Sequence, residues 1–384
     1  MHSRDLGKGM VRVTKIAATH AVDVDRTSKF PGEAVAALKA ERLFGAPLPL
    51  VVGGEGATTL DIAEICFALG RVCSSTAMIF AMHHIQLACI FRHAGDNPWC
   101  KRFLAHLAAD QLLLAGSTTD AASGGDIRHS NSAVFAEGDR FNLSKAAAVA
   151  SYAEYADGIL VTTRRSPEAL ASDQVAVVVK KADYTLEKIA DWDALGMRGT
   201  CSASYRLTAT GEQDQVLPAA FSLIHQTTML PIAHILWSSV WLGIAADALE
   251  RTRQYVKSSY GGARRAPLGT LGTARAVGDV FALRAAIARV IEKYDGFDLQ
   301  QLQSFEFQAE ANFLKVTVSE WAVEAVLTAL RTCGLAGYRN DSPFSVGRHL
   351  RDVLSAPLMI GNDRILAGVS AAATMLDLNT RLLK

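Results

Sequence analysis

The spacing of apolar residues divides the chain into three parts. From about Phe30 to Ala109, apolar residues recur every three or four positions, which is the period of an amphipathic helix. From Gln111 to about Pro218, short apolar runs alternate with turn residues such as Asp157-Gly158, which predicts β-strands. After Phe221, helical spacing returns in four long segments, at about residues 232–259, 274–294, 304–331 and 362–382.

This order predicts an α+β fold with three domains. We expect a helical N-terminal domain at residues 1–109, a central β domain of barrel-like or sandwich type at 110–220, and a C-terminal four-helix bundle at 221–384. The central strands have no helices between them, which argues against a Rossmann-type parallel sheet. The GxGxxG, Walker A and HExxH patterns are also absent from the sequence.

The composition is typical of a globular cytoplasmic protein. The 384 residues are 50% hydrophobic, so the chain can bury a large core. Lys and Arg number 39 against 38 Asp and Glu, a net charge of +1, which gives no basic field for a nucleic-acid partner. Six cysteines occur without a CxxC pair, which predicts reduced, buried thiols and no metal site.

One stretch, Leu230 to Leu249, is long and apolar enough to resemble a membrane span. It contains Pro231, His234 and Asp247, which are costly in lipid. The centre of a helical bundle requires a helix that is apolar on most sides. We therefore expect a buried core helix and no membrane partner.

Six short motifs occur in an order that resembles the acyl-CoA dehydrogenase superfamily along nearly the whole chain. Gly196–Thr200 (GMRGT) reproduces the family's Gly-Met-Arg-Gly-Ser/Thr closely. The other five are Gly53–Gly56, Ser117–Asp126, Lys145–Asp157, Cys333–Tyr338 and Arg351-Asp352. Each motif is short, but six in the family's order identify the chain as similar to this superfamily.

The resemblance implies a flavoprotein oxidoreductase with FAD bound between the β domain and the bundle, usually as a homotetramer built as a dimer of dimers. The hydroxyls of Thr119 and Ser151 suit the polar edge of a flavin, and Val149 suits its apolar ring. By resemblance, the cofactor-binding residues are Ser117, Thr119, Val149, Ser151, Arg331 and Gly334, and the substrate-binding residues are Gly125 and Arg198.

The usual catalytic base of the family is missing. Dehydrogenases of this family use a glutamate to take the α-proton of an acyl thioester, at one of two positions. These positions correspond to Ile360 and Ala233 here. Neither side chain can accept a proton. The resemblance therefore implies an unusual base, for which His234 is the first candidate, with a pKa expected near neutrality, and Asp363 is the second.

The contacts to the adenine half of FAD are also altered. The family arginine that reaches the FAD pyrophosphate corresponds to Ser259, with Arg264 and Arg265 nearby as substitutes. The family glutamine before the Cys-Gly motif corresponds to Arg331, whose charge suits a phosphate. FMN is therefore an alternative to FAD.

Three functions follow from the resemblance. The leading hypothesis is α,β-dehydrogenation of an acyl thioester, as in fatty acid metabolism, with electrons passed to an acceptor flavoprotein. The alternative is a flavin-dependent monooxygenase that uses oxygen, although residues 355–363 lack the histidine that such relatives often carry. The third is a catalytically silent homologue that binds a flavin or an acyl group.

Overall fold

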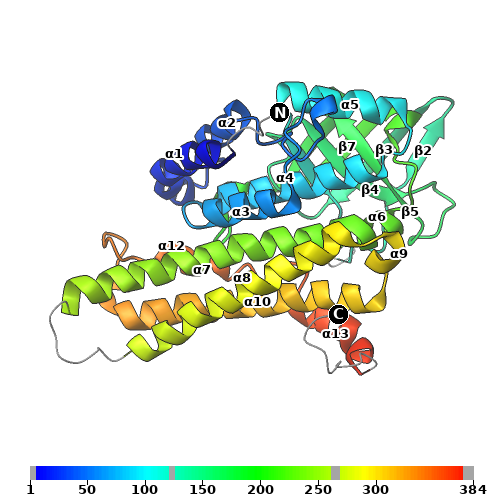
Figure 1. Ribbon diagram of the computed structural model, residues 1–384. Coiled ribbons are helices and arrows are strands. Elements are labelled where there is room, and N and C mark those ends of the chain that lie inside the picture. Colours follow the sequence, from blue (N-terminus) through cyan, green and yellow to red (C-terminus); the bar gives the residue numbers. More distant parts are fainter. Residues whose placement is uncertain (1–5, 121–125, 261–268, 375–384) are drawn as a thin grey trace.

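A computed structural model describes residues 6–120, 126–260 and 269–374. The first part of the chain is helical, as Figure 1 shows in blue and cyan. Its helices are α1 (Leu6–Thr27), α2 (Gly32–Ala40), α3 (Thr59–Gly70), α4 (Ser74–His93) and α5 (Pro98–Asp110), with a short 3₁₀ turn at Leu50–Val52. Helix α3 starts at a capping box in which Thr58 accepts from the Asp61 amide and Asp61 accepts from the Thr58 amide.

Two small sheets form the central part. One has the order β1-β4-β5 and the other the order β2-β3-β7-β6. Strand β1 pairs with β4 in parallel, and every other named pair is antiparallel. The strands are β1 (Leu114–Ser117), β2 (Val134–Glu137), β3 (Arg140–Ala147), β4 (Gly158–Arg164), β5 (Gln174–Lys180), β6 (Tyr184–Ala190) and β7 (Ser204–Glu212), with 3₁₀ turns at Lys181–Asp183, Arg198–Thr200 and Gln213–Gln215.

Long helices return after the sheets. They are α7 (Leu230–Tyr260), α8 (Thr270–Gly296), α10 (Phe305–Cys333) and α13 (Asn362–Ala373). Figure 1 shows α7, α8 and α10 running side by side beneath α3 and α4. The shorter elements are α6 (Phe221–Ile224), a π-helical turn at His225–Met229, α9 (Leu299–Leu302), α11 (Leu335–Tyr338) and α12 (Gly347–Val353).

Two glycines let α3 and α7 touch backbone to backbone. A Cβ at Gly243 of α7 would lie 2.3 Å from the carbonyl oxygen of Phe67. A Cβ at Gly70 of α3 would lie 2.4 Å from the carbonyl oxygen of Val240. Both distances are shorter than any normal contact, so only glycine fits at this crossing. The crossing fixes the bundle against the N-terminal helices.

The predicted fold class is confirmed: helices, a β region and a helical bundle follow one another in the expected order. All six cysteines are free, and five are buried, whereas Cys201 is partly exposed and departs from the predicted burial. Two helical stretches, Ser74–His93 and Phe221–Ser259, are apolar enough to cross a membrane, but 83% and 89% of their most apolar windows are buried inside the protein. Their burial is that of helices in a protein core.

Candidate active site

A cavity of about 680 Å³ lies where the β region meets α4, α7 and the loop before α13. One wall comes from the end of β1 and the segment after β3: Gly116, Thr118, Thr119, Asp120, Ala148, Val149, Ser151 and Tyr152. The opposite walls come from α4 and from the start of α7: Met82, Ile85, Gln86, Met229, Leu230, Ala233 and Trp237. Residues 358–361 and Arg364 close the remaining side. This is the place that the sequence predicted for a flavin.

Hydroxyl groups line the β wall and are held in place from behind. Thr119 and Ser151, which the sequence analysis expects to bind the flavin, both line the cavity. The Ser151 hydroxyl lies 2.8 Å from the Ser202 hydroxyl, which lies 2.7 Å from that of Thr200. Thr200 in turn donates to the carbonyl oxygen of Met197, at 2.8 Å. This chain of hydroxyls ties Ser151 to the Gly196–Thr200 motif and orients it toward the cavity.

A buried lysine supports the same wall. Lys145 on β3 is fully buried and donates to the carbonyl oxygen of Thr162, at 2.6 Å. Its ammonium lies 3.8 Å from the carboxylate of Asp120, which also accepts from the Asn131 amide and the Ser132 hydroxyl. Burial lowers the pKa of Lys145 to about 8. Asp120 is thus engaged in holding the wall together.

The helical walls carry two buried polar atoms without hydrogen-bond partners. They are Oε1 of Gln86 on α4 and Nε1 of Trp237 on α7, and both residues line the cavity. Buried polar atoms are normally paired, so an unpaired acceptor and donor here indicate a site built for a polar ligand. Gly116 leaves room for the Gln86 amide, because a Cβ there would lie 2.5 Å from Gln86 Nε2.

A histidine that the sequence analysis missed also lines the cavity. His225 opens the π-helical turn before α7, and such turns are frequent at functional sites. Burial lowers the pKa of His225 to about 4, and Arg128 lowers it further while Asp126 opposes the shift. The ring is therefore neutral near pH 7 and can accept or donate a hydrogen bond. No motif marks this residue in the sequence.

Both positions of the family's catalytic glutamate face the cavity. Ala233 is 3% exposed on α7, and Ile360 lies in the loop before α13. Ile360 has a φ of 63°, a left-handed conformation that is unfavourable for a β-branched residue. The only carboxylate among the described lining residues is that of Asp120. The cavity wall is therefore apolar at the two places where a proton acceptor is usual.

The two bases predicted from the sequence do not line this cavity. His234 is buried in the bundle, where its Nδ1 lies 3.1 Å from the carbonyl oxygen of Ala311 on α10. Burial lowers the pKa of His234 to about 3, so the expected pKa near neutrality is wrong. Asp363 is an exposed residue in the first turn of α13. Proximity to a catalytic position in the sequence did not place either side chain in the cavity.

The other predicted residues fall into three groups. Val149 lines the cavity, whereas Ser117 is fully buried with its hydroxyl unpaired and points to the other side of β1. Arg198 lies in a separate cleft, where it donates to the Ser28 hydroxyl at 2.9 Å, so its expected place at the mouth of this cavity is not met. Arg331 is exposed and pairs with Glu324 at 3.0 Å, near the exposed Gly334 at the end of α10. Gly125, Arg264 and Arg265 lie outside the described residues.

The residues present fit a flavin ring. Hydroxyls and unpaired polar atoms stand on two sides of an otherwise apolar cavity, and its volume is in the range of sites for small organic ligands. In the part of the chain that the structure describes, no group of three or more His, Cys, Asp or Glu residues could hold a metal ion.

Comparison with known proteins identifies the family. Residues 12–111 match the acyl-CoA dehydrogenase N-terminal domain, and residues 225–375 match the acyl-CoA dehydrogenase C-terminal domain. Cyclohex-1-ene-1-carbonyl-CoA dehydrogenase of Geobacter metallireducens is 25% identical, over 95% of this chain and 96% of that protein. Amino sugar nitrososynthase DnmZ of Streptomyces peucetius is 24% identical, over 88% of this chain and 84% of that protein.

A solved structure has the same fold. FMN-bound TdsC from Paenibacillus sp. A11-2 superposes with a TM-score of 0.85 and 16% identity, over 97% of this chain and 98% of that one. The two domain matches together span well over half of the sequence, and the fold, the order of motifs and the position of the cavity agree with them. The chain belongs to the acyl-CoA dehydrogenase superfamily.

Proposed function

We propose that the chain is a flavin-dependent monooxygenase that acts on an apolar aromatic substrate. The observation that carries the proposal is the apolar lining at Ala233 and Ile360, the two positions where a dehydrogenase of this family carries its base. Proton abstraction from an acyl thioester needs an acceptor in reach of the α-carbon, and Asp120, the only described carboxylate in the cavity, is already engaged by Lys145, Asn131 and Ser132.

In this proposal the β wall binds the flavin and the helices bind the substrate. Thr119 and Ser151 hydrogen-bond the polar edge of the ring, and Val149 packs against it. A reduced flavin bound here would supply two electrons to O₂. One oxygen atom of O₂ would then enter the substrate, and the other would leave as water. Met82, Ile85 and Met229 exclude water from the cavity, and the neutral His225 accepts a hydrogen bond from a hydroxyl or N–H of the substrate.

FMN is the proposed flavin. Ser259 replaces the family arginine that contacts the FAD pyrophosphate, and Arg331 is paired with Glu324. TdsC, whose fold this chain shares, is described as a dibenzothiophene monooxygenase and has been solved with FMN and with indole. A separate reductase would then supply the electrons.

A homo-oligomer in the cytoplasm completes the proposal. Leu271 and Phe281 on α8 are 88% and 67% exposed, and burying such side chains against a second copy would stabilise an assembly. The free cysteines suit a reducing compartment.

The test measures oxygen use against thioester oxidation. The purified chain, loaded with chemically reduced FMN, is mixed with air-saturated buffer and indole, and oxygen uptake and hydroxylated product are measured. The Ala233→Phe variant, which fills the cavity, should lose product formation while circular dichroism shows it folded. Anaerobic bleaching of bound oxidised flavin by a panel of acyl-CoA thioesters, with no hydroxylated product in air, would overturn the proposal.

Dehydrogenation of an acyl thioester is the second candidate, because several relatives at about 24% identity are named acyl-CoA dehydrogenases. In that case Asp363 or His234 would have to approach the substrate by movement of the loop or the bundle. Retained thioester-dependent bleaching in Asp363→Asn and its loss in His234→Gln would assign the base to His234, and the reverse result would assign it to Asp363.

A further inference from the structure

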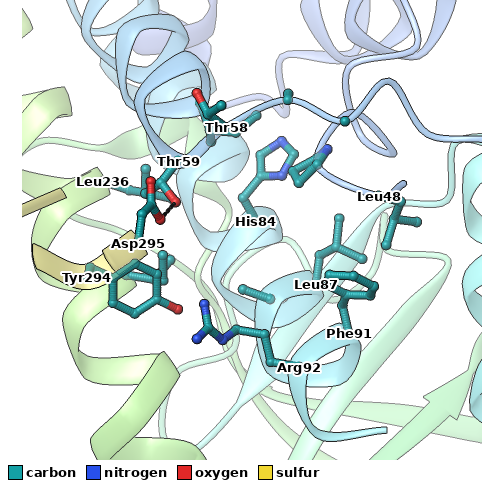
Figure 2. A pocket seen from close by; sticks show the side chains of 16 residues that line it. Leu48, Thr58, Thr59, His84, Leu87, Phe91, Arg92, Leu236, Tyr294 and Asp295 are labelled. Atoms are coloured by element: carbon teal, nitrogen blue, oxygen red, sulfur yellow. Dashed lines mark hydrogen bonds between the residues drawn. The ribbon is translucent and has the colours of Figure 1, made fainter. Parts of the chain in front are cut away.

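A second cavity, of about 390 Å³, lies on the other side of α4 from the flavin-type cavity (Figure 2). Helix α4 presents Met82, Ile85 and Gln86 to the first cavity, and His84 and the residues at 87, 88, 91 and 92 to the second. The remaining walls are the loop before α3, the start of α7 and the end of α8. The two cavities share no lining residue, so this inference does not depend on the proposed function.

Apolar side chains form most of the second cavity. They are Leu48, Ile62, Leu87, Phe91, Ile232 and Leu236. In Figure 2, Leu48, Leu87 and Phe91 stand on one side and Leu236 on the other, with open space between them. A volume near 390 Å³ with apolar walls is at the lower end of the range for small-molecule sites.

A buried histidine stands at one end of this space. His84 is 3% exposed, and neither of its ring nitrogens makes a hydrogen bond. The backbone of Leu43 raises the pKa of the ring, although no acceptor lies within hydrogen-bond geometry of either ring nitrogen. Burial, with a smaller contribution from His83, nevertheless lowers the pKa well below its usual range. The ring is therefore a neutral donor and acceptor in need of a partner.

A tyrosine and an arginine stand at the other end. Tyr294 is 1% exposed, and its buried hydroxyl has no partner within hydrogen-bond geometry. The Arg92 guanidinium lies over the Tyr294 ring, 4.8 Å from its centre, and Figure 2 shows the hydroxyl pointing toward the arginine. The nearby Asp295 carboxylate is turned to the Thr59 hydroxyl, at 2.6 Å, which leaves the guanidinium facing the cavity.

We propose that this cavity binds a monocarboxylic acid that has an apolar body and a hydroxyl group at its far end. Arg92 and Tyr294 hold the carboxylate, the apolar walls hold the body, and His84 hydrogen-bonds the hydroxyl. His84 and Arg92 are eight residues apart on one helix, about 12 Å along its axis, so a ligand that contacts both must have an extended body. The buried His84 ring and Tyr294 hydroxyl, which have no hydrogen-bond partner, each gain one in this arrangement, and the exposed Arg92 guanidinium adds a charged contact.

The experiment titrates the purified full chain with 8-hydroxyoctanoate by isothermal titration calorimetry. Octanoate lacks the hydroxyl and 1,8-octanediol lacks the carboxylate, so both should bind more weakly. Arg92→Gln should raise the Kd of 8-hydroxyoctanoate about tenfold or more, and Tyr294→Phe several-fold. His84→Leu should bring the Kd of 8-hydroxyoctanoate close to that of octanoate. Arg102→Gln, at an exposed arginine of α5, is the matched control and should leave every Kd unchanged.

A further variant separates the two cavities. Met82→Trp fills the flavin-type cavity and should not change the binding of 8-hydroxyoctanoate. If Met82→Trp abolishes binding and Arg92→Gln does not, the acid binds in the flavin-type cavity and the proposal is overturned. Absence of binding to the unmodified chain overturns it as well. Thermal unfolding of each variant shows whether it is folded, and Tyr294→Phe, which removes one oxygen atom, tests the site even if His84→Leu does not fold.

Discussion

The buried lysine behind the β wall should leave a measurable signature in the pH dependence of stability. Lys145 is fully buried, and the Thr162 carbonyl and hydroxyl oxygens and the more distant Asp120 carboxylate offset its lost hydration. Desolvation is the larger effect, and it lowers the pKa of Lys145 from 10.5 to about 8. Lys145→Met removes this titration and nearly preserves the volume of the side chain.

The sign follows from proton counting. Between about pH 8 and pH 10.5 the unfolded chain holds a proton on Lys145 that the folded chain has lost, so stability rises with pH in this window. The full shift of 10.5 − 8 = 2.5 corresponds to about 3.4 kcal/mol, at about 1.36 kcal/mol for each pKa unit. From about pH 7.5 to about pH 10, two-state titration with these pKa values gives a gain of about 2.4 kcal/mol.

Urea unfolding at a series of pH values tests this. Other groups titrate in the same window, among them Lys315, whose pKa burial lowers to about 8. They are present in both proteins, so the difference between wild type and Lys145→Met isolates Lys145. Lys145→Met also loses the hydrogen bond to Thr162, but this loss is independent of pH. It shifts the stability difference between the two proteins by a constant and does not change how that difference depends on pH. Lys101→Met, at a lysine that is 58% exposed, is the control and should leave the pH dependence unchanged.

The reasoning fails if the wild type and Lys145→Met give parallel stability curves from about pH 7.5 to about pH 10. Parallel curves would mean that Lys145 keeps an ordinary pKa, and therefore that water or a stronger contact with Asp120 compensates its burial.

Three further changes test other parts of the structure. Gly243→Ala should lower the free energy of unfolding in urea by about 1–3 kcal/mol, because its Cβ would meet the Phe67 carbonyl. Gly278→Ala on α8, with open space around it, is the control and should be neutral or stabilising. Equal effects of the two changes would contradict the close crossing of α3 and α7. Ser151→Ala should weaken FMN binding by about 0.5–1.5 kcal/mol in a fluorescence titration, and an unchanged affinity would remove Ser151 from the flavin site. Ile360→Glu should introduce anaerobic flavin bleaching by an acyl-CoA thioester, since it places a carboxylate in the cavity; no bleaching would show that the loop does not present this position to a substrate.

Apolar spacing and motif order were sufficient to predict the fold. The periods of 3.6 and 2 residues report directly which face of a helix or strand is buried, and this determines element type. Thr119, Val149 and Ser151, which were predicted to bind the flavin, all line the cavity, because they belong to motifs whose backbone path the fold fixes. The sequence alone therefore located cavity residues where a continuous stretch of chain forms the cavity wall.

Side-chain direction was not predictable in the same way. His234 follows Ala233, which faces the cavity, but one residue along a helix turns the side chain by about 100°, and His234 therefore faces α10. Ser117 is likewise one residue from Gly116 and Thr118 and lies on the opposite face of its strand. His225 and Gln86 enter the cavity from a π-helical turn and from α4, and only the packing of distant segments brings them there.

The loop at residues 358–361 forms an apolar part of the cavity wall, and its residue Ile360 has an unfavourable backbone conformation. A β-branched residue in the left-handed region costs about 1–2 kcal/mol, and a free loop would relax to avoid it. This loop is held on both sides, since the Met359 amide donates to the Ser355 carbonyl and Asn362 accepts from the buried Lys315 at 2.6 Å. The fold therefore keeps Ile360 against the cavity where a carboxylate would serve proton abstraction. If the proposed monooxygenase function is correct, this wall serves it by excluding water from the reacting centre.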